Sequence, residues 1–161
     1  MANPHLAAYL NDHLADATAS INLLDHLERE HGTSPIGTLA AALREDEVAD
    51  REALEDLMDR LGIARDVPKQ AVSRLSVLLS QAKLRLDEPA HSPLRLLEIV
   101  EALSLGIEGK RLLWRSLKTA AVYNPELQGT DYPGLERRAD EQRIGIEPFR
   151  MGAAKGSFAP A

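Results

Sequence analysis

The chain has 161 residues, of which 44% are hydrophobic, 27% are charged and only 4% are aromatic. This length suits one folded domain, and apolar residues that are mainly Leu and Ala favour helices over strands. A formal net charge of −6 argues against a surface for nucleic acid. The absence of cysteine excludes disulfides, thiolate nucleophiles and cysteine-ligated metal sites.

The beginning of the chain, MANPHLAAYLNDH, lacks the basic stretch and the apolar run of a signal peptide. No segment approaches the 18 or so consecutive apolar residues of a membrane span. We therefore expect a cytoplasmic protein that has neither a membrane nor a nucleic-acid partner.

Five helices are predicted, mainly from their start signals. Asn3-Pro4, Ser34-Pro35 and Ser92-Pro93 each place a side-chain oxygen at the N-cap and proline at the first helical position. Asp66 and Asp131 stand in the same relation to a proline two residues later. Combined with glycines and prolines that mark helix ends, these signals predict helices at about 4–31, 35–61, 67–86, 93–122 and 132–144.

The first two predicted helices carry polar residues inside apolar stripes. In the helix 4–31, His13 stands among leucines and alanines spaced by three and four residues. In the helix 35–61, Glu47 and Asp50 fall in the centre of a leucine stripe. A helical periodicity thus points two carboxylates toward the core.

The long predicted helix 93–122 is apolar on two sides, so we expect it inside the bundle or at a subunit contact. Its second stripe includes Glu101 and Glu108. Ala102, Gly106 and Gly109 form a strip of small residues, which permits close approach of another helix. We expect that partner to be the helix 67–86 or a second copy, and hence a homodimer or other homo-oligomer through one of these helices.

The last predicted helix, 132–144, presents Arg138 and Gln142 on its apolar side. Pro148 would remove a backbone hydrogen bond and clash with the preceding turn. We therefore expect residues 1–145 to form the helical bundle and 146–161 to form a kinked or loosely ordered tail.

The connections give the expected topology. Short links join the first two helices and the last two, so each pair forms an antiparallel hairpin, and a long crossover containing an extra helix joins the hairpins. This arrangement resembles the ferritin-like superfamily, an all-α four-helix bundle. The resemblance implies inward Glu and Glu-x-x-His ligands for two iron or manganese ions, and activities in iron storage, peroxide destruction or oxidation.

The metal ligands of that family are only partly present. Glu47 and Asp50 have the Glu-x-x-His spacing, but Asp50 stands at the histidine position, and the helix 132–144 has no such pair. We therefore expect a polar layer at mid-bundle without metal or other cofactor, in which a guanidinium supplies the positive charge. Its predicted members are His13, Glu47, Asp50, Glu101 and Arg138, with Glu108 and Gln142 at the margins.

Two other interpretations of the carboxylates stay open. Glu47 and Asp50 could face water at the edge of the stripe, or they could bind iron or manganese together with His13 and Glu101. The sequence accordingly favours a structural or protein-interaction role of unknown biochemistry over an enzyme. The alternative is a di-metal carboxylate protein of the oxidase type, and a third possibility is a small-ligand carrier.

Overall fold

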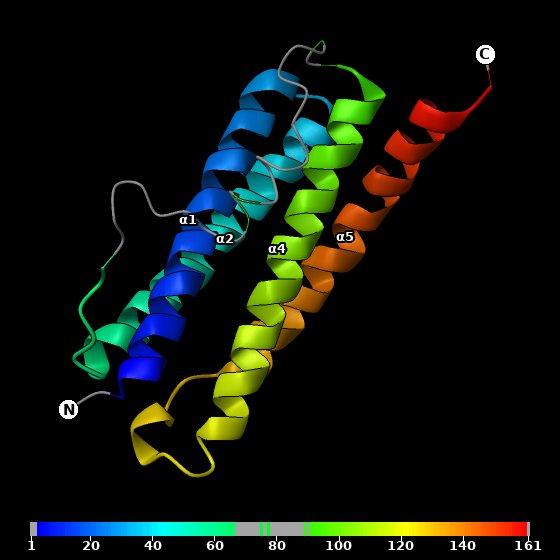
Figure 1. Cartoon of the computed structure of the whole chain (residues 1–161). Helices are drawn as coiled ribbons and strands as arrows, with labels where there is room; N and C mark the ends of the chain where they lie inside the picture. The colour runs from blue at the N-terminus through cyan, green and yellow to red at the C-terminus, as the bar shows by residue number, and fades with distance from the viewer. Residues whose placement is uncertain (1–2, 67–74, 76, 78–88, 90, 161) are drawn as a thin grey trace.

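A computed structural model shows an all-helical bundle and describes residues 3–66, 75, 77, 89 and 91–160. Within these residues there are four long helices, one short 3-10 helix and no strand. Labelled as in Figure 1, they are α1 (Pro4–His31), α2 (Pro35–Arg60), α4 (Pro93–Ala120), η1 (Pro125–Leu127) and α5 (Tyr132–Phe158). The helix predicted at 67–86 lies outside the described residues, except for Leu75 and Val77, which are helical.

The helices begin where the capping signals predict. The side-chain oxygens of Asn3, Ser34 and Asp131 accept backbone N–H groups from the first turns of α1, α2 and α5. These bonds replace partners that the first turn of a helix lacks. Gly32 and Gly62 follow α1 and α2 with φ of 53° and 64°, a left-handed backbone that ends a helix and that few other residues adopt.

The four helices form two antiparallel hairpins, α1 with α2 and α4 with α5, which pack side by side (Figure 1). Arg95, at the start of α4, donates to Glu30 at the end of α1, with 2.7 Å between nitrogen and oxygen. Arg60, at the end of α2, donates to the carbonyl of Gln128 between α4 and α5. The end of α2 and the start of α4 therefore lie at opposite ends of the bundle, and these two helices run in the same direction.

Two apolar clusters fill the bundle on either side of its middle. The first cluster contains Leu10, Leu14, Leu54, Leu57, Met58, Ile63, Leu113, Trp114, Leu117, Leu127, Tyr132 and Leu135. The second cluster contains Leu23, Leu24, Leu27, Ile36, Ala40, Leu43, Leu75, Ile99, Val100, Ala102, Leu103 and Ile146. On α2, residues 44–53 separate the two clusters, and the polar residues of interest lie in that interval.

Helix α5 corrects the prediction for the end of the chain. The helix continues through Pro148 to Phe158, so its predicted end at 144 is wrong, and most of the expected tail is helical. Pro148 and Ile144 are both exposed, so the carbonyl that loses its helical partner meets water rather than the core. Ile146 and Ala153 are buried, and their packing continues the inward stripe of the helix.

None of the described helices combines the length and apolar character that crossing a bilayer requires.

Candidate functional site

A group of polar side chains lies buried between the two apolar clusters. Glu47 and Asp50 come from α2, Lys110 from α4 and Gln142 from α5, and each residue exposes between 1% and 8% of its surface. Arg138 of α5 reaches the same carboxylates from the edge of the bundle. We call these five residues the lysine cluster. The helical period that places Glu47 and Asp50 in an apolar stripe therefore also buries them.

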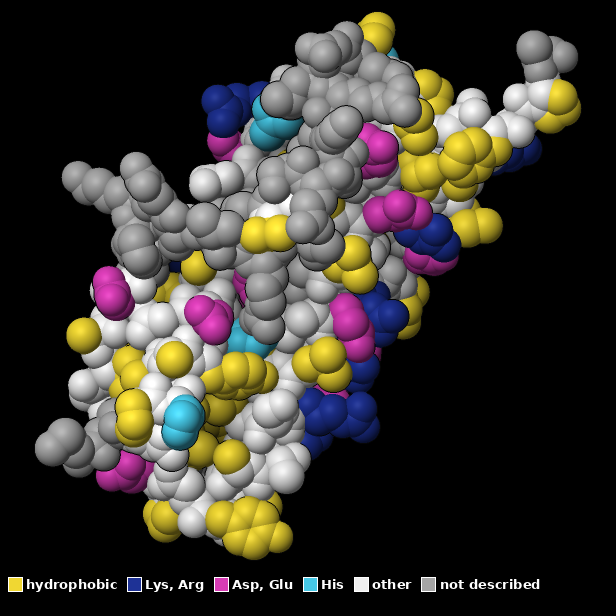
Figure 2. Space-filling model, in the orientation of Figure 1, with side chains coloured by type: hydrophobic (Ala, Val, Ile, Leu, Met, Phe, Trp, Pro, Cys, Tyr) yellow, Lys and Arg dark blue, Asp and Glu magenta, His cyan; other side chains and the backbone are white. Residues whose placement is uncertain are grey.

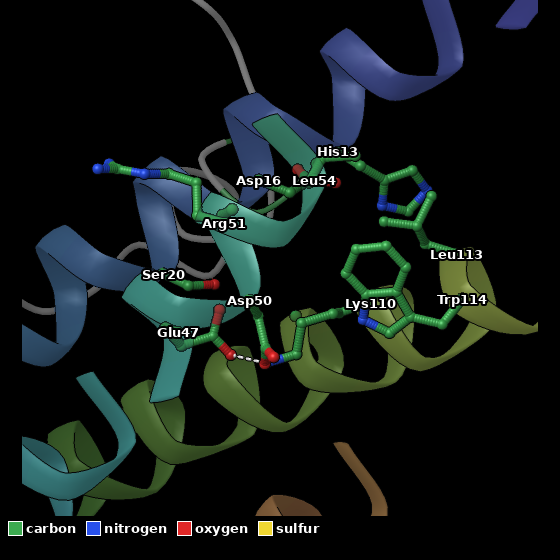
Figure 3. A pocket seen from close by; sticks show the side chains of 12 residues that line it. His13, Asp16, Ser20, Glu47, Asp50, Arg51, Leu54, Lys110, Leu113 and Trp114 are labelled. Carbon is green, nitrogen blue, oxygen red and sulfur yellow. Dashed lines mark hydrogen bonds and ion pairs between the residues drawn. The ribbon is translucent and has the colours of Figure 1, made fainter. Parts of the chain in front are cut away.

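The ammonium of Lys110 is the centre of the lysine cluster. Its Nζ donates to Asp50 Oδ2 at 2.6 Å, to Gln142 Oε1 at 2.7 Å and to Glu47 Oε1. A protonated lysine has three N–H donors, and all three are used. Figure 3 shows the Lys110 side chain extending from α4 toward the two carboxylates of α2. One cation thereby holds α2, α4 and α5 together.

Arg138 balances the remaining negative charge. Its Nη1 donates to Asp50 Oδ1 at 2.7 Å, so the two oxygens of Asp50 bind two different cations. Two carboxylates and two cations make the lysine cluster neutral as a whole. This balance matters because an unpaired charge in an apolar core costs several kcal/mol even after relaxation, about the whole stability of a marginal domain.

Burial raises the pKa of the Glu47 carboxyl above its usual value, and the attraction and hydrogen bond of Lys110 only partly oppose this effect. Burial therefore makes the Glu47 carboxylate easier to protonate than that of an exposed glutamate. Its charged form depends on Lys110 for compensation.

Two predicted members of the polar layer, Glu101 and Glu108, lie elsewhere. Glu101 is half exposed and faces Arg150 on the surface, 3.5 Å away. Glu108 accepts two hydrogen bonds from Arg111, at 2.9 and 2.7 Å, and lies 3.1 Å from Arg143. Placing Glu101 in the layer is therefore wrong, and Glu108 belongs to ion pairs between α4 and α5. The reason is rotation: both acids face away from the core side of α4, which carries Lys110.

His13 is buried near the lysine cluster. Its ring meets Tyr9 edge-on, with 4.6 Å between ring centroids. It lines the same cavity as Glu47 and Asp50, but in Figure 3 the ring points away from both carboxylates. The imidazole therefore lies beside the lysine cluster, packed against Tyr9.

The lysine cluster does not fit an iron or manganese ion. An ion between Glu47 and Asp50 would meet the Lys110 ammonium, which already lies within hydrogen-bond distance of both carboxylates. The two positive charges would repel each other at close range. Over the part of the chain that the structure describes, no three His, Asp or Glu side chains are grouped to hold a metal.

A cavity of about 20 Å³ lies beside the lysine cluster (Figure 3). Residues of α1, α2 and α4 line it, among them Ser20, Arg51 and Trp114. The buried indole N–H of Trp114 has no acceptor among the described residues. A cavity of this size has room for about one water molecule, and a buried donor of this kind is a typical partner for one.

The small residues of α4 behave differently from one another. Ala102 is buried in the second cluster. A Cβ on Gly106 would lie 3.0 Å from Ser20 Oγ and 3.6 Å from Leu75 Cδ2, so this glycine allows α1 to approach closely. Around Gly109, no described atom comes within 4 Å of the Cβ position. Close packing is thus present at two of the three predicted positions.

Sequence reasoning missed Lys110, although a signal was available. On α4, Leu103, Ile107 and Trp114 lie on one apolar face of the helix. Lys110 lies on the same face, between Ile107 and Trp114. A lysine at a core-facing position of a long apolar helix, in a chain that also buries two acids, is the cation expected to pair with those acids. The expected cation was the guanidinium of Arg138, but this group contacts Asp50 only from the edge of the bundle.

A scan with protein-family models found no match to this sequence, and searches of curated proteins and of solved structures also found none.

Proposed function

We propose that this chain is a ferritin-like helical bundle in which Lys110 takes the place of a metal ion, and that it serves as a structural or protein-interaction module rather than as an enzyme. The observation that carries the proposal is the use of all three Lys110 donors by Glu47, Asp50 and Gln142. A side-chain cation at this position neutralises the acids and ties three helices in one register.

The helix order supports the ferritin-like part of the proposal. Two antiparallel hairpins are joined by a long connection, and α2 and α4 run in the same direction (Figure 1). Bundles with one long crossover of this kind include the ferritin-like proteins. The Glu47 and Asp50 pair on α2 stands at the spacing of the family's metal ligands.

The di-metal alternative requires His13, Glu47, Asp50 and Glu101 to act together. Glu101 instead faces Arg150, and the His13 ring points away from the acids of α2. The cavity at the lysine cluster, with about 20 Å³, is likewise too small for an organic ligand. At this site, both alternatives therefore need a rearrangement of the core.

The test is the metal content of the full-length protein purified from cultures supplied with iron, manganese or zinc. We expect far less than one metal ion per chain in the wild type. Asp50→Ala and Glu52→Ala serve as a matched pair, since both remove one acid from α2 and only Asp50 is buried. Stoichiometric metal that is lost in Asp50→Ala and kept in Glu52→Ala would overturn the proposal.

A further inference from the structure

The outer face of the α4–α5 hairpin carries apolar side chains that no described part of the chain covers. Leu105 and Leu112 of α4 expose 55% and 46% of their surfaces, and Ile144 and Met151 of α5 expose 73% and 55%. Pro148 is exposed between the last two. We call these five residues the outer face. Figure 2 shows apolar side chains along this hairpin, interspersed with charged ones. Exposed apolar residues are ordinary singly, but several together mark an interaction site.

A surface groove runs along the outer face. It has a volume of about 780 Å³ and is lined by Ser104, Asp140, Arg143, Ile144, Glu147, Pro148 and Met151. Apolar and charged residues of α5 both line it, and two of the charged ones, Asp140 and Arg143, pair with α4. A partner therefore has to supply apolar side chains and a matching row of charges.

The charges of α5 along this edge are complementary to themselves. Asp140, Arg143, Glu147 and Arg150 alternate in sign at spacings of three, four and three residues. Read backwards, the row has the same spacing and the opposite sign at every position. An antiparallel second copy centred on residue 145 places Asp140 opposite Arg150 and Arg143 opposite Glu147, twice each by symmetry. Ile144 lies one residue from this centre.

The four side chains are available for such contacts. Asp140, Arg143 and Glu147 are each about half exposed, and Arg150 is 29% exposed. Within one chain they already pair along α5, with 2.6 Å between Arg150 and Glu147 and 3.9 Å between Arg143 and Asp140. Three of them also pair with α4, at 3.5 Å for Asp140 with Arg111, 3.1 Å for Arg143 with Glu108 and 3.5 Å for Arg150 with Glu101. These charges are therefore already paired before a second copy binds, so the contact does not remove water from isolated charges.

We propose that the outer face is a two-fold symmetric docking surface for a second copy of this chain, with the two α5 helices antiparallel. Ile144, Pro148 and Met151 form its apolar centre, and the alternating charges of α5 set the register. The proposal names a partner for the interaction role proposed above and rests on that role only in part, since the metal content and the association state are measured separately.

The first experiment measures association of the full chain by sedimentation equilibrium from low micromolar to several hundred micromolar concentration. The wild type should approach twice its monomer mass of 17.6 kDa. Ile144→Glu should raise the dissociation constant at least about tenfold, because it buries a carboxylate at the centre of the contact. Val122→Glu is the matched control, since Val122 is 72% exposed but lies beyond the end of α4.

The second experiment tests the register. Arg143→Glu brings like charges together across the two-fold axis and should weaken the dimer, and adding Glu147→Arg restores opposite charges and should recover it. Circular dichroism of each variant checks that the helices remain. A wild type that stays monomeric at every concentration would overturn the proposal. So would a dimer that survives Ile144→Glu, or one that Val122→Glu weakens equally.

Discussion

Lys110 and Arg111 are neighbours in the sequence, yet they belong to two different electrostatic regions. Lys110 points into the lysine cluster and is almost wholly buried. Arg111 points to the seam between α4 and α5, where it pairs with Glu108 and lies near Asp140. Ion pairs at the seam keep contact with water, whereas those that Lys110 forms with Glu47 and Asp50 are almost wholly buried. The same chemistry should therefore matter much more inside the bundle than along the seam.

Removing the central cation should have the largest effect. Lys110→Met keeps a side chain of similar length but leaves Glu47 and Asp50 without their shared donor, and breaking a buried pair in this way costs about 3–5 kcal/mol. Urea unfolding measures the loss. Lys118→Met is the control, because Lys118 is 43% exposed and pairs at the seam with Glu136. Equal losses in the two variants would contradict the contrast between the regions.

The pH dependence of stability should carry the signature of Glu47. Burial raises the pKa of its carboxyl above 4.5, so the folded state holds this proton more tightly than the unfolded state does. The contribution of Glu47 to stability is then greatest below pH 4.5 and falls as pH rises through its folded pKa. Relative to Glu47→Gln, the wild type should lose at most about 1.4 kcal/mol per pH unit in that window.

Urea unfolding of both proteins at a series of pH values gives this difference directly. Glu47→Gln preserves the size of the side chain and removes its titration. A difference that grows in favour of the wild type as pH rises would mean that Lys110 dominates over burial, with the pKa of Glu47 lowered instead.

Arg138 should give an intermediate effect. Its side chain is 39% exposed, and Asp50 keeps Lys110 when Arg138 is lost. We expect Arg138→Ala to cost about 1 kcal/mol in unfolding free energy, after allowance for solvent screening. Arg115→Ala, which removes an exposed pair with Glu136 at the seam, should cost less than Arg138→Ala. Chemical denaturation of the two variants compares them, and the reverse order would be inconsistent with a buried acceptor at Asp50.

The polar residues show how far periodicity leads. Glu47 and Asp50 are buried as their stripe predicts, because a helix fixes which side chains share a face. Arg138 and Gln142 join them for the same reason. Glu101 does not, since α4 has apolar residues on two sides and periodicity alone leaves its core side ambiguous. The burial of Lys110 could have been inferred from its position on the core-facing side of α4, but the identity of its three acceptors could not.

The sequence by itself determined the helical class, the starts of the four described helices and the burial of two acids, because capping and amphipathic spacing act within a few residues. Only the tertiary structure decided which cation meets those acids, and that α5 continues beyond Pro148. Both depend on how each helix is rotated against its neighbours. That rotation points Lys110 into the core and Pro148 toward water, and it follows from the packing of the whole bundle.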